Sequence, residues 1–479
     1  MTSYLVQTLG CKLNQLESEA IIDVFAQAGF EYIPDSNNLK TKNGVVELPS
    51  VIVINTCTVT SKADQKARRV IRKALRDYPN SIVIVTGCYA RLNKDDLLKL
   101  DTREEQRLYV IDKEKILELI NNINVDKESI SKTNPLHSKL NINHSTFHIP
   151  HSTLITPHST LDTKQTTNNS FEFNPKRFSK HTRSFLKIQD GCDNHCTYCR
   201  IRLARGPSIS LESGEVLSRL RILEQSYNEA VLTGVNICQY NNEQLTMNNE
   251  QISGNNLTGL LDYLIYNTKK IALRLSSLAP DSIDSHFTGV LSNRRIRPHF
   301  HLSVQSCSQK ILERMGRIYN SQTIEEAVAL LRKAKVDPFL ACDIITGFPG
   351  ETNAEFEETY NMCKKLDFAW IHVFPYSPRQ GTAAFSFKDN ITESEVTKRV
   401  QLFTDLAWHG RKQYVQRWLG KEVDILIENN KKGYCHGTSE NYLKALIQCG
   451  KETPPPGTAL RCKLTEEGNF KDFDVIGKI

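Results

Sequence analysis

The sequence has 479 residues, of which 39% are hydrophobic and 24% charged, and its formal net charge is +7. This composition is typical of a soluble protein of roughly three domains. No stretch approaches the ~18 apolar residues that a membrane-spanning helix needs, and the N-terminus lacks the features of a signal peptide. Thirteen cysteines without an export signal favour cofactor thiolates in a reducing cytoplasm over disulfides.

The N-terminal region predicts alternating strands and helices. Helices are expected over 16–28 and 64–78, and apolar strands over 4–9, 51–56 and 81–86. Each strand leads into a cysteine, namely Cys11, Cys57 and Cys88. Because the carboxyl ends of parallel strands meet at one edge of an open sheet, the three thiols should lie together and form a cluster site. A buried structural role for one of them is the alternative, since free cysteine buries readily.

Two segments have the composition of inserts. Residues 131–170 are rich in Asn, Ser, Thr, His and Pro, and His-Ser-Thr recurs three times. Their histidines could suggest metal binding, but nothing in the segment could form a core, so we predict a disordered linker. Residues 241–256 repeat Asn-Asn-Glu-Gln and predict a second insert on a loop.

The most informative motif is a CxxxCxxC formed by Cys192, Cys196 and Cys199, directly after a predicted strand at 185–188. Three thiolates are one fewer than a closed zinc site or a fully ligated iron–sulfur cluster needs. A [4Fe–4S] cluster held by three cysteines has one open iron that can bind a substrate or cofactor. The alternative is a zinc knuckle whose fourth ligand lies elsewhere, with His195 as the nearest candidate.

Strand and helix patterns alternate for about 200 residues around and beyond this motif. Strands are expected over 185–188, 229–235, 272–277, 300–304, 340–345 and 371–374, and helices over 213–225, 308–315, 323–335 and 354–366. Six such units predict a partial barrel with its active site on the C-terminal face. Polar or glycine-containing strand ends, together with Tyr198 inside the cysteine motif, are candidates to line the cofactor pocket: Thr233, Gly234, Asn236, Ser276, Gln305 and Asp343.

The C-terminal part predicts a long helix and a small barrel. A basic amphipathic helix is expected over 392–419, followed by strands over 422–427, 442–448, 459–464 and 474–476. Small barrels of the oligonucleotide-binding kind offer a strand face and loops to nucleic acid. Basic residues are concentrated at 62–76 and 398–421; each segment alone is typical of a solvated helix face, and together they permit a polyanionic partner.

The combination of motifs resembles the radical S-adenosylmethionine (SAM) methylthiotransferase family over essentially the whole chain outside the two inserts. The matching segments are Thr8–Asn14 with Glu17, Asn55–Thr60, Gly87–Ala90, the three cysteines Cys192, Cys196 and Cys199, Ala204–Gly206, Leu232–Asn236, Arg274–Ser277, Gly347–Thr352 and Ser439–Tyr442.

The resemblance implies an α/β fold in three parts: an N-terminal Rossmann-like open parallel sheet, a central TIM-like partial (βα)6 radical SAM barrel and a small antiparallel TRAM-like β-barrel. The expected boundaries are 1–125 for the N-terminal domain, 126–180 for the linker, 181–391 for the radical SAM core, 392–420 for the connecting helix and 421–479 for the RNA-binding barrel.

The resemblance also implies the chemistry, which replaces a C–H bond by C–S–CH3 with two [4Fe–4S] clusters and two SAM molecules per turnover. Carried over, Cys192, Cys196 and Cys199 hold the cluster that cleaves SAM to a 5′-deoxyadenosyl radical. Cys11, Cys57 and Cys88 hold the auxiliary cluster that carries the sulfur. The implied partners are tRNA, held by the terminal barrel with help from the basic helix before it, and a reductant such as flavodoxin or ferredoxin. The sulfur donor is not indicated, and no membrane is involved.

Gly-Cys-Lys-Leu-Asn at 10–14 looks most like the branch that acts on C2 of N6-threonylcarbamoyladenosine at tRNA position 37. The alternatives are the isopentenyladenosine branch, the branch that modifies a ribosomal-protein aspartate, and a non-catalytic iron–sulfur RNA-binding protein. The sequence departs from the family pattern at Leu203, Ile209, Cys238, Ala279 and Cys307, near the expected SAM face. The remaining cysteines are interpreted as structural or incidental: Cys238, Cys307, Cys342, Cys363, Cys435, Cys449 and Cys462.

Overall fold

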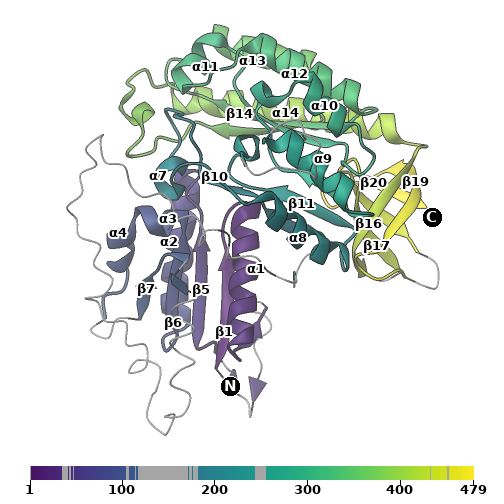
Figure 1. Cartoon of the computed structure of the whole chain (residues 1–479). Coiled ribbons are helices and arrows are strands. Elements are labelled where there is room, and N and C mark those ends of the chain that lie inside the picture. Colours follow the sequence, from purple (N-terminus) through teal and green to yellow (C-terminus); the bar gives the residue numbers. More distant parts are fainter. Residues whose placement is uncertain are drawn as a thin grey trace. The chain divides into compact units, whose positions relative to one another are not determined.

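The computed structural model describes residues 2–34, 41–42, 45–46, 48–103, 107–113, 115–116, 171, 175, 178, 182–242, 255–431, 433–449 and 453–478. They form two compact units, one of Met1–Thr58 with Lys62–Pro175 and one of Val59–Ser61 with Lys176–Ile479 (Figure 1). The predicted linker at 131–170 and most of the predicted insert at 241–256 lie outside the described residues. Among the helices that the structure describes, none combines the length and apolarity of a membrane span.

The first unit contains the predicted open parallel sheet. Its strand order is β2 (Glu31–Ile33), β1 (Ser3–Thr8), β5 (Val51–Thr56), β6 (Ile82–Gly87) and β7 (Leu108–Val110), and every pairing is parallel. A separate pair is formed by β3 (Thr41–Lys42) and β4 (Val45–Val46). The strand order reverses between β1 and β5, and this is the place where open sheets of this kind bind ligands.

Helices cover both faces of this sheet. Ile21 and Phe25 of α1 (Lys12–Gln27) are buried with Tyr4 and Val53, on one side of the strands. On the other side, α2 (Ser61–Asp77) is buried along its apolar stripe, together with residues of β5 and β6. Two short helices, α3 (Cys88–Leu92) and α4 (Lys94–Leu98), follow β6. β5 is buried at all six positions, which explains why its sequence is a continuous β-favouring run.

The second unit contains six parallel barrel strands in two sheets. One sheet has the order β12 (Ala272–Leu275), β11 (Glu229–Thr233), β8 (Ser184–Lys187), and the other has the order β13 (His299–Gln305), β14 (Phe339–Thr346), β15 (Trp370–Pro375). Isolated bridges from Leu273 to Ile296 and from Leu278 to Leu302 join the two sheets. The strands therefore follow one another in chain order, which confirms the predicted partial (βα)6 barrel.

The intervening elements match most of the predicted helices within a few residues. They are α7 (Ile201–Arg205), α8 (Ser213–Glu224), α9 (Leu257–Asn267), α10 (Ser285–Leu291), α11 (Gln309–Met315), α12 (Ser321–Ala334), α13 (Asn353–Lys365) and α14 (Glu393–Trp418). A short antiparallel pair, β9 (Gln189–Asp190) with β10 (Ile209–Ser210), encloses the cysteine motif.

The chain ends in a closed barrel of β16 (Glu422–Lys431), β17 (Tyr434–Ser439), β18 (Lys444–Gln448), β20 (Val475–Lys478) and β19 (Ala459–Glu467). The predicted small barrel is confirmed, but it is not wholly antiparallel, because β18 and β20 pair in parallel. A closed ring of five strands cannot alternate direction at every pairing. No strand was predicted at β17. Gly437 in this strand lies close to the carbonyl oxygen of Leu426, because it has no side chain. A disulfide between Cys435 and Cys449, which we did not expect, lies in this barrel.

The terminal barrel shares its hydrophobic core with the (βα)6 barrel. Phe339 and Ala341 of β14 and Tyr414 of α14 are buried in one cluster with barrel residues such as Val423 and Ile425. Removal of residues 421–479 would expose this core to water. We therefore expect the truncation to destabilise the whole second unit, so point substitutions are the better test of RNA binding by the barrel.

The arginines of α14 are engaged within the protein. Arg399 donates to Glu351 at 2.8 Å, and Arg411 to Asp474 at 2.9 Å. Arg417 makes ion pairs of 3.1 Å with Asp337 and Asp367 at the helix C-terminus. These three arginines are therefore paired with carboxylates of the protein, and the expected help of this helix in RNA binding stays a prediction.

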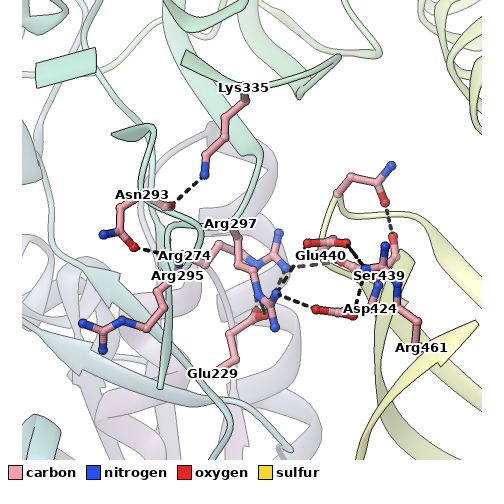
Figure 2. A network of polar contacts seen from close by, with 11 residues as sticks. Glu229, Arg274, Asn293, Arg295, Arg297, Lys335, Asp424, Ser439, Glu440 and Arg461 are labelled. Carbon is pink, nitrogen blue, oxygen red and sulfur yellow. Dashed lines mark hydrogen bonds and ion pairs between the residues drawn. The ribbon is translucent and has the colours of Figure 1, made fainter. Parts of the chain in front are cut away.

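A buried carboxylate at the start of β11 holds three arginines together, and Figure 2 shows two of them, Arg274 and Arg297. Glu229 accepts from Nε of Arg274 at 2.8 Å and from Nε of Arg297 at 3.0 Å, and Arg183 lies 3.8 Å away. Burial alone would raise the pKa of Glu229, but the guanidinium groups outweigh it and lower the pKa to about 2. The carboxylate is therefore ionised at neutral pH and balances part of the surrounding positive charge.

Two of these arginines also contact the terminal barrel. Arg274 Nη2 donates to the carbonyl oxygen of Ser439 at 3.3 Å. Arg297 Nη1 lies 3.8 Å from Asp424 and 3.7 Å from Glu440 (Figure 2). The ion-pair network thus links the first sheet of the (βα)6 barrel to β16 and β17.

We expect Glu229→Gln to lower the free energy of unfolding by about 3–5 kcal/mol at pH 7, because it leaves buried arginines without their anion. The contribution of the carboxylate should be complete above its unfolded-state pKa of 4.5 and be lost as the pH falls from there toward 2, since the folded pKa is the lower one. Urea unfolding at several pH values measures both effects. Glu215→Gln, which removes the ion pair between the exposed Glu215 and Arg219 on α8, is the control and should change stability by less than about 1 kcal/mol. An equal effect of both variants would contradict this account.

Candidate functional site

The first candidate site lies at the carboxyl edge of the sheet in the first unit. Thr8 of β1 and Thr86 of β6 both pair with Asn55 of β5, so the loops after the three strands are neighbours. Cys11 caps the N-terminus of α1, Cys57 follows β5, and Cys88 begins α3. Cys57 and Cys88 are buried and Cys11 is exposed. The structure therefore brings to one edge three thiols from distant parts of the sequence.

Two glycines allow these loops to approach one another. At Gly10, with φ of +119°, an added Cβ would lie 2.4 Å from Cβ and 2.9 Å from Sγ of Cys57. At Gly87, with φ of +95°, it would lie 2.3 Å from the carbonyl oxygen of Thr56. Only glycine combines this backbone conformation with the absence of a side chain. The glycine before Cys11 and the glycine before Cys88 thus both pack against the loop that carries Cys57.

Buried polar side chains fix the three loops. Asn14 Nδ2 donates to the carbonyl oxygens of Leu9 at 3.1 Å and Thr56 at 2.9 Å, while Asn55 Nδ2 donates to the carbonyl oxygen of Asn14 at 2.9 Å. Thr56 Oγ1 donates to the carbonyl oxygen of Thr86 at 2.6 Å. Asn14 and Asn55 are each only 1% exposed. These residues belong to the matching family segments, but no role was predicted for them. What could have indicated their structural role is an amide side chain on an otherwise buried face of a strand or helix.

The second candidate site is the cysteine loop between β9 and β10 of the second unit. The amide of Cys192 donates to the carbonyl oxygen of Gly206 at 3.1 Å, and that of Cys199 donates to the carbonyl oxygen of Cys196 at 3.2 Å. Thr197 anchors the middle of the loop, because its amide and hydroxyl donate to the carbonyl oxygens of Met315 and Arg314. These backbone contacts hold the loop between α7 and the end of α11.

A partly buried arginine lies beside this loop. Arg317 Nη2 donates to the hydroxyl of Tyr198 at 2.9 Å. Burial raises the pKa of Cys192, and it raises that of Cys199 to about 11, while the charge of Arg317 acts in the opposite direction. A metal centre that binds these thiols as thiolates would displace their protons. Arg317 was not predicted as a site residue. It lies two residues after the end of α11 at Met315, and nothing in the neighbouring sequence indicates its contact with Tyr198.

The donor sets fit iron–sulfur clusters better than a single zinc ion. Within the described ranges, no three Cys, His, Asp or Glu side chains converge on one metal position. A zinc ion requires such convergence, whereas in a four-iron cluster each thiolate binds a different iron. His195, the candidate fourth ligand of a zinc knuckle, has its Nε2 2.5 Å from Arg202 Nη1, next to a permanent positive charge. Each cysteine triad therefore offers three sulfur donors, and His195 is poorly placed to serve as a fourth ligand of the second triad.

Part of the predicted cofactor pocket lies against the cysteine loop. The amide of Asn236 donates to Gln189 Oε1 at 2.9 Å, and a hydrogen bond between its side chain and Cys192 offsets part of the rise that burial causes in the pKa of that thiol. A Cβ on Gly234 would lie 2.7 Å from the carbonyl oxygen of Gln189. Thr233 ends β11 and is buried. Gln189, which we did not predict, thus connects the end of β11 to the start of the loop.

The other predicted pocket residues lie at the carboxyl ends of the neighbouring strands. The amide of Ser276 donates to the carbonyl oxygen of Leu232 at 3.0 Å, and Gln305 ends β13 with an unusual φ of +65°. Tyr198 packs edge-to-face on Phe348, at 6.2 Å between ring centroids.

Asp343 belongs to a chain of polar contacts that crosses the barrel. His301 Nε2 lies 3.2 Å from Asp343 Oδ1, at an angle that does not make a hydrogen bond, and His301 Nδ1 lies 2.7 Å from Ser277 Oγ. These polar contacts connect the segment after β12 to β13, and β13 to β14. The sequence analysis missed His301, because a histidine within a strand gives no distinctive signal.

Three of the departures from the family pattern are accommodated by packing. Cys238 Sγ accepts from the amide of Ala279 at 3.2 Å, so two of these positions contact each other. Cys307 is buried, and its amide donates to Thr359 Oγ1 at 3.1 Å. Leu203 is 55% exposed on α7, and Ile209 belongs to β10.

Comparisons with known proteins agree with the fold and the motifs. The family described as "Uncharacterized protein family UPF0004" matches residues 3–108, and the Radical SAM superfamily matches residues 186–363. The threonylcarbamoyladenosine tRNA methylthiotransferase MtaB of Treponema pallidum (strain Nichols) is 36% identical over 98% of this chain and 99% of that protein. The protein of the same name from Thermotoga maritima is 31% identical over 93% and 91% of the two chains.

The solved structures resemble this chain only weakly. The radical S-adenosylmethionine methyltransferase TsrM from Kitasatospora setae, with cobalamin and a [4Fe-4S] cluster bound, gives a TM-score of 0.47 at 14% identity over 78% of this chain and 75% of that chain. The near-complete coverage of relatives at 30% identity or more is the stronger finding. This chain therefore belongs to the radical SAM methylthiotransferase family, which includes the MtaB-type tRNA enzymes, and is itself a methylthiotransferase.

Proposed function

We propose that this enzyme methylthiolates C2 of N6-threonylcarbamoyladenosine at position 37 of tRNA, in the cytoplasm. The observation that carries the proposal is the match to relatives of that name over nearly the full length of both chains. The segment Gly10–Asn14, on which the resemblance to this branch rests, lies at the first cysteine site. A C–H bond of the adenine ring has no useful acidity, so its substitution needs chemistry that a cofactor supplies.

The two cysteine triads are assigned different roles in this proposal. Cys192, Cys196 and Cys199 would hold one [4Fe–4S] cluster, and Cys11, Cys57 and Cys88 would hold the other. When bound, the first supplies the electron that cleaves SAM and the second supplies the sulfur, with two SAM molecules used per turnover. Support comes from the fit of both donor sets and from their separate backbone frameworks, one in each compact unit.

The residues around the second triad would bind and orient SAM. Asn236 contacts Cys192, and Gly234 leaves room for the loop beside it. The remaining residues assigned to this pocket are Thr233, Ser276, Gln305, Asp343 and Tyr198. Their common property is a place at the carboxyl end of the barrel strands or on the cysteine loop, the end at which barrels of this kind bind ligands.

The proposed domain organisation follows the sequence boundaries. Residues 1–125 carry the auxiliary cluster, 126–180 are a linker, 181–391 form the radical SAM core, 392–420 the connecting helix and 421–479 the TRAM-like RNA-binding barrel. The proposal includes a reductant such as flavodoxin or ferredoxin and a sulfur donor that we do not specify.

Nucleoside analysis of tRNA tests this function. Bulk tRNA from a strain that lacks the gene should contain N6-threonylcarbamoyladenosine without its 2-methylthio derivative, and expression of this chain should restore the derivative. Mass spectrometry of the digested tRNA measures both nucleosides. Loss of the methylthio group from isopentenyladenosine, or from a ribosomal-protein aspartate, would instead identify one of the alternative substrates. Unchanged modification of every one of them would reject the enzymatic assignment.

A further inference from the structure

One face of α2 is strongly positive. The helix carries seven basic residues, and five of them recur at the spacing of one exposed stripe: Lys62, Lys66, Arg69, Lys73 and Arg76. Arg72 is also exposed. The opposite face is buried in the sheet through Ala67, Ile71, Ala74 and Leu75. The helix is therefore anchored by its apolar side and presents its cations to solvent.

Within the part of the chain that the structure describes, these cations have almost no carboxylate partners. Among the described residues, Lys62, Lys66, Arg69, Arg72 and Lys73 make no ion pair, and Arg76 pairs only with the adjacent Asp77 on the same helix. The acidic residue near the start of the helix, Asp64, is turned inward and accepts from the hydroxyl of Thr58.

Two other helices of this protein differ from α2, because their arginines pair with carboxylates. On α8, the partly buried Arg219 pairs with the exposed Glu215 one turn away at 2.6 Å. On α14, the arginines are used in contacts with Glu351, Asp474, Asp337 and Asp367. The two basic segments that look alike in the sequence therefore differ: α14 uses its guanidinium groups internally, and α2 leaves its cations available.

The stripe has the length of an RNA contact and begins at the first cysteine site. Lys62 and Arg76 are separated by 14 helical steps, or about 21 Å at about 1.5 Å per residue. Lys62 comes five residues after Cys57, so the stripe starts next to the edge of the sheet where Cys11, Cys57 and Cys88 meet. A backbone bound along α2 would thus lead toward that edge.

We propose that the exposed face of α2 binds the phosphate backbone of the RNA substrate, an inference that rests on the proposed function. A membrane surface fits less well, because the apolar face that would enter the lipid is packed against the sheet. A protein partner would need an apolar or aromatic centre, and the stripe has none. Exposed lysine and arginine side chains along one stripe are suited to bind phosphate groups. Such contacts position the RNA but do not recognise its base sequence.

The test uses the full chain with its clusters reconstituted and measures tRNA binding against salt concentration. The variant changes Lys62, Lys66, Arg69 and Lys73 to Gln, which keeps helix propensity and side-chain length. We expect affinity for tRNA to fall at least about tenfold. The slope of log K against log salt should become shallower by about four, since each lost phosphate contact removes about one unit. Iron content and SAM cleavage should stay at the level of the unmodified enzyme.

A control variant carries the same change in net charge elsewhere. Lys269, Lys270, Arg294 and Lys333 are exposed on the second unit, and their change to Gln should leave affinity and slope within about twofold of the unmodified enzyme. Equal losses in both variants, or no loss in the α2 variant, would overturn the inference. If the unmodified enzyme itself bound tRNA no better than an unrelated single-stranded RNA, the proposed function would fail before the role of α2 was reached.

Discussion

Replacing Cys192, Cys196 and Cys199 together with alanine is expected to abolish SAM cleavage and to halve the iron content of the reconstituted protein, from about eight to about four atoms per chain. The physical reason is that these three thiols are the sulfur donors of the second unit's cysteine loop, whose backbone is fixed by Gly206, Met315 and Arg314. Release of 5′-deoxyadenosine and iron analysis measure the two effects.

Cys238→Ala is the matched control for this substitution. Cys238 lies in the same unit, and its sulfur accepts from the amide of Ala279. Its loss should leave the iron content and SAM cleavage unchanged. Stoichiometric zinc in place of iron in the unmodified protein would contradict the assignment of both triads.

Replacing Cys11, Cys57 and Cys88 with alanine should stop methylthiolation without stopping SAM cleavage. SAM cleavage should continue while the methylthiolated product disappears, and the iron content should again fall by about half. The two triads are held by different backbones in different compact units, so loss of one donor set leaves the loop of the other intact. The measurement combines 5′-deoxyadenosine release with nucleoside analysis of the tRNA in the same reaction. Undiminished methylthiolation in this variant would refute the role given to the first triad.

The sequence predicted best those elements whose signal is local. β5 agrees at both ends, because all six of its residues are buried and read as one continuous strand. The three cysteines of the first unit could be placed together from topology alone, since parallel strands share a carboxyl edge. β17 was missed because Gly437 and its polar neighbours interrupt the strand pattern, although the barrel needs that glycine for close packing.

Features that depend on distant partners could not be predicted. Arg399 meets Glu351 across 48 positions, and Arg411 meets Asp474 across 63, so the sequence could not distinguish the internal cations of α14 from the exposed ones of α2. His301 and Arg317 acquire their positions beside the proposed SAM pocket only in the folded barrel. The parallel pairing of β18 and β20 follows from closure of the ring rather than from the residues of either strand.

The most direct test of the central claim is a reaction of the purified, reconstituted enzyme with SAM, a reductant and defined tRNA. One sample of tRNA carries N6-threonylcarbamoyladenosine at position 37, and a second carries isopentenyladenosine there. We predict that mass spectrometry of the digested tRNA finds the 2-methylthio nucleoside in the first sample alone, together with released 5′-deoxyadenosine. Methylthiolation confined to the second sample, or a reaction that forms no methylthio nucleoside in either while both clusters are loaded, would contradict the account.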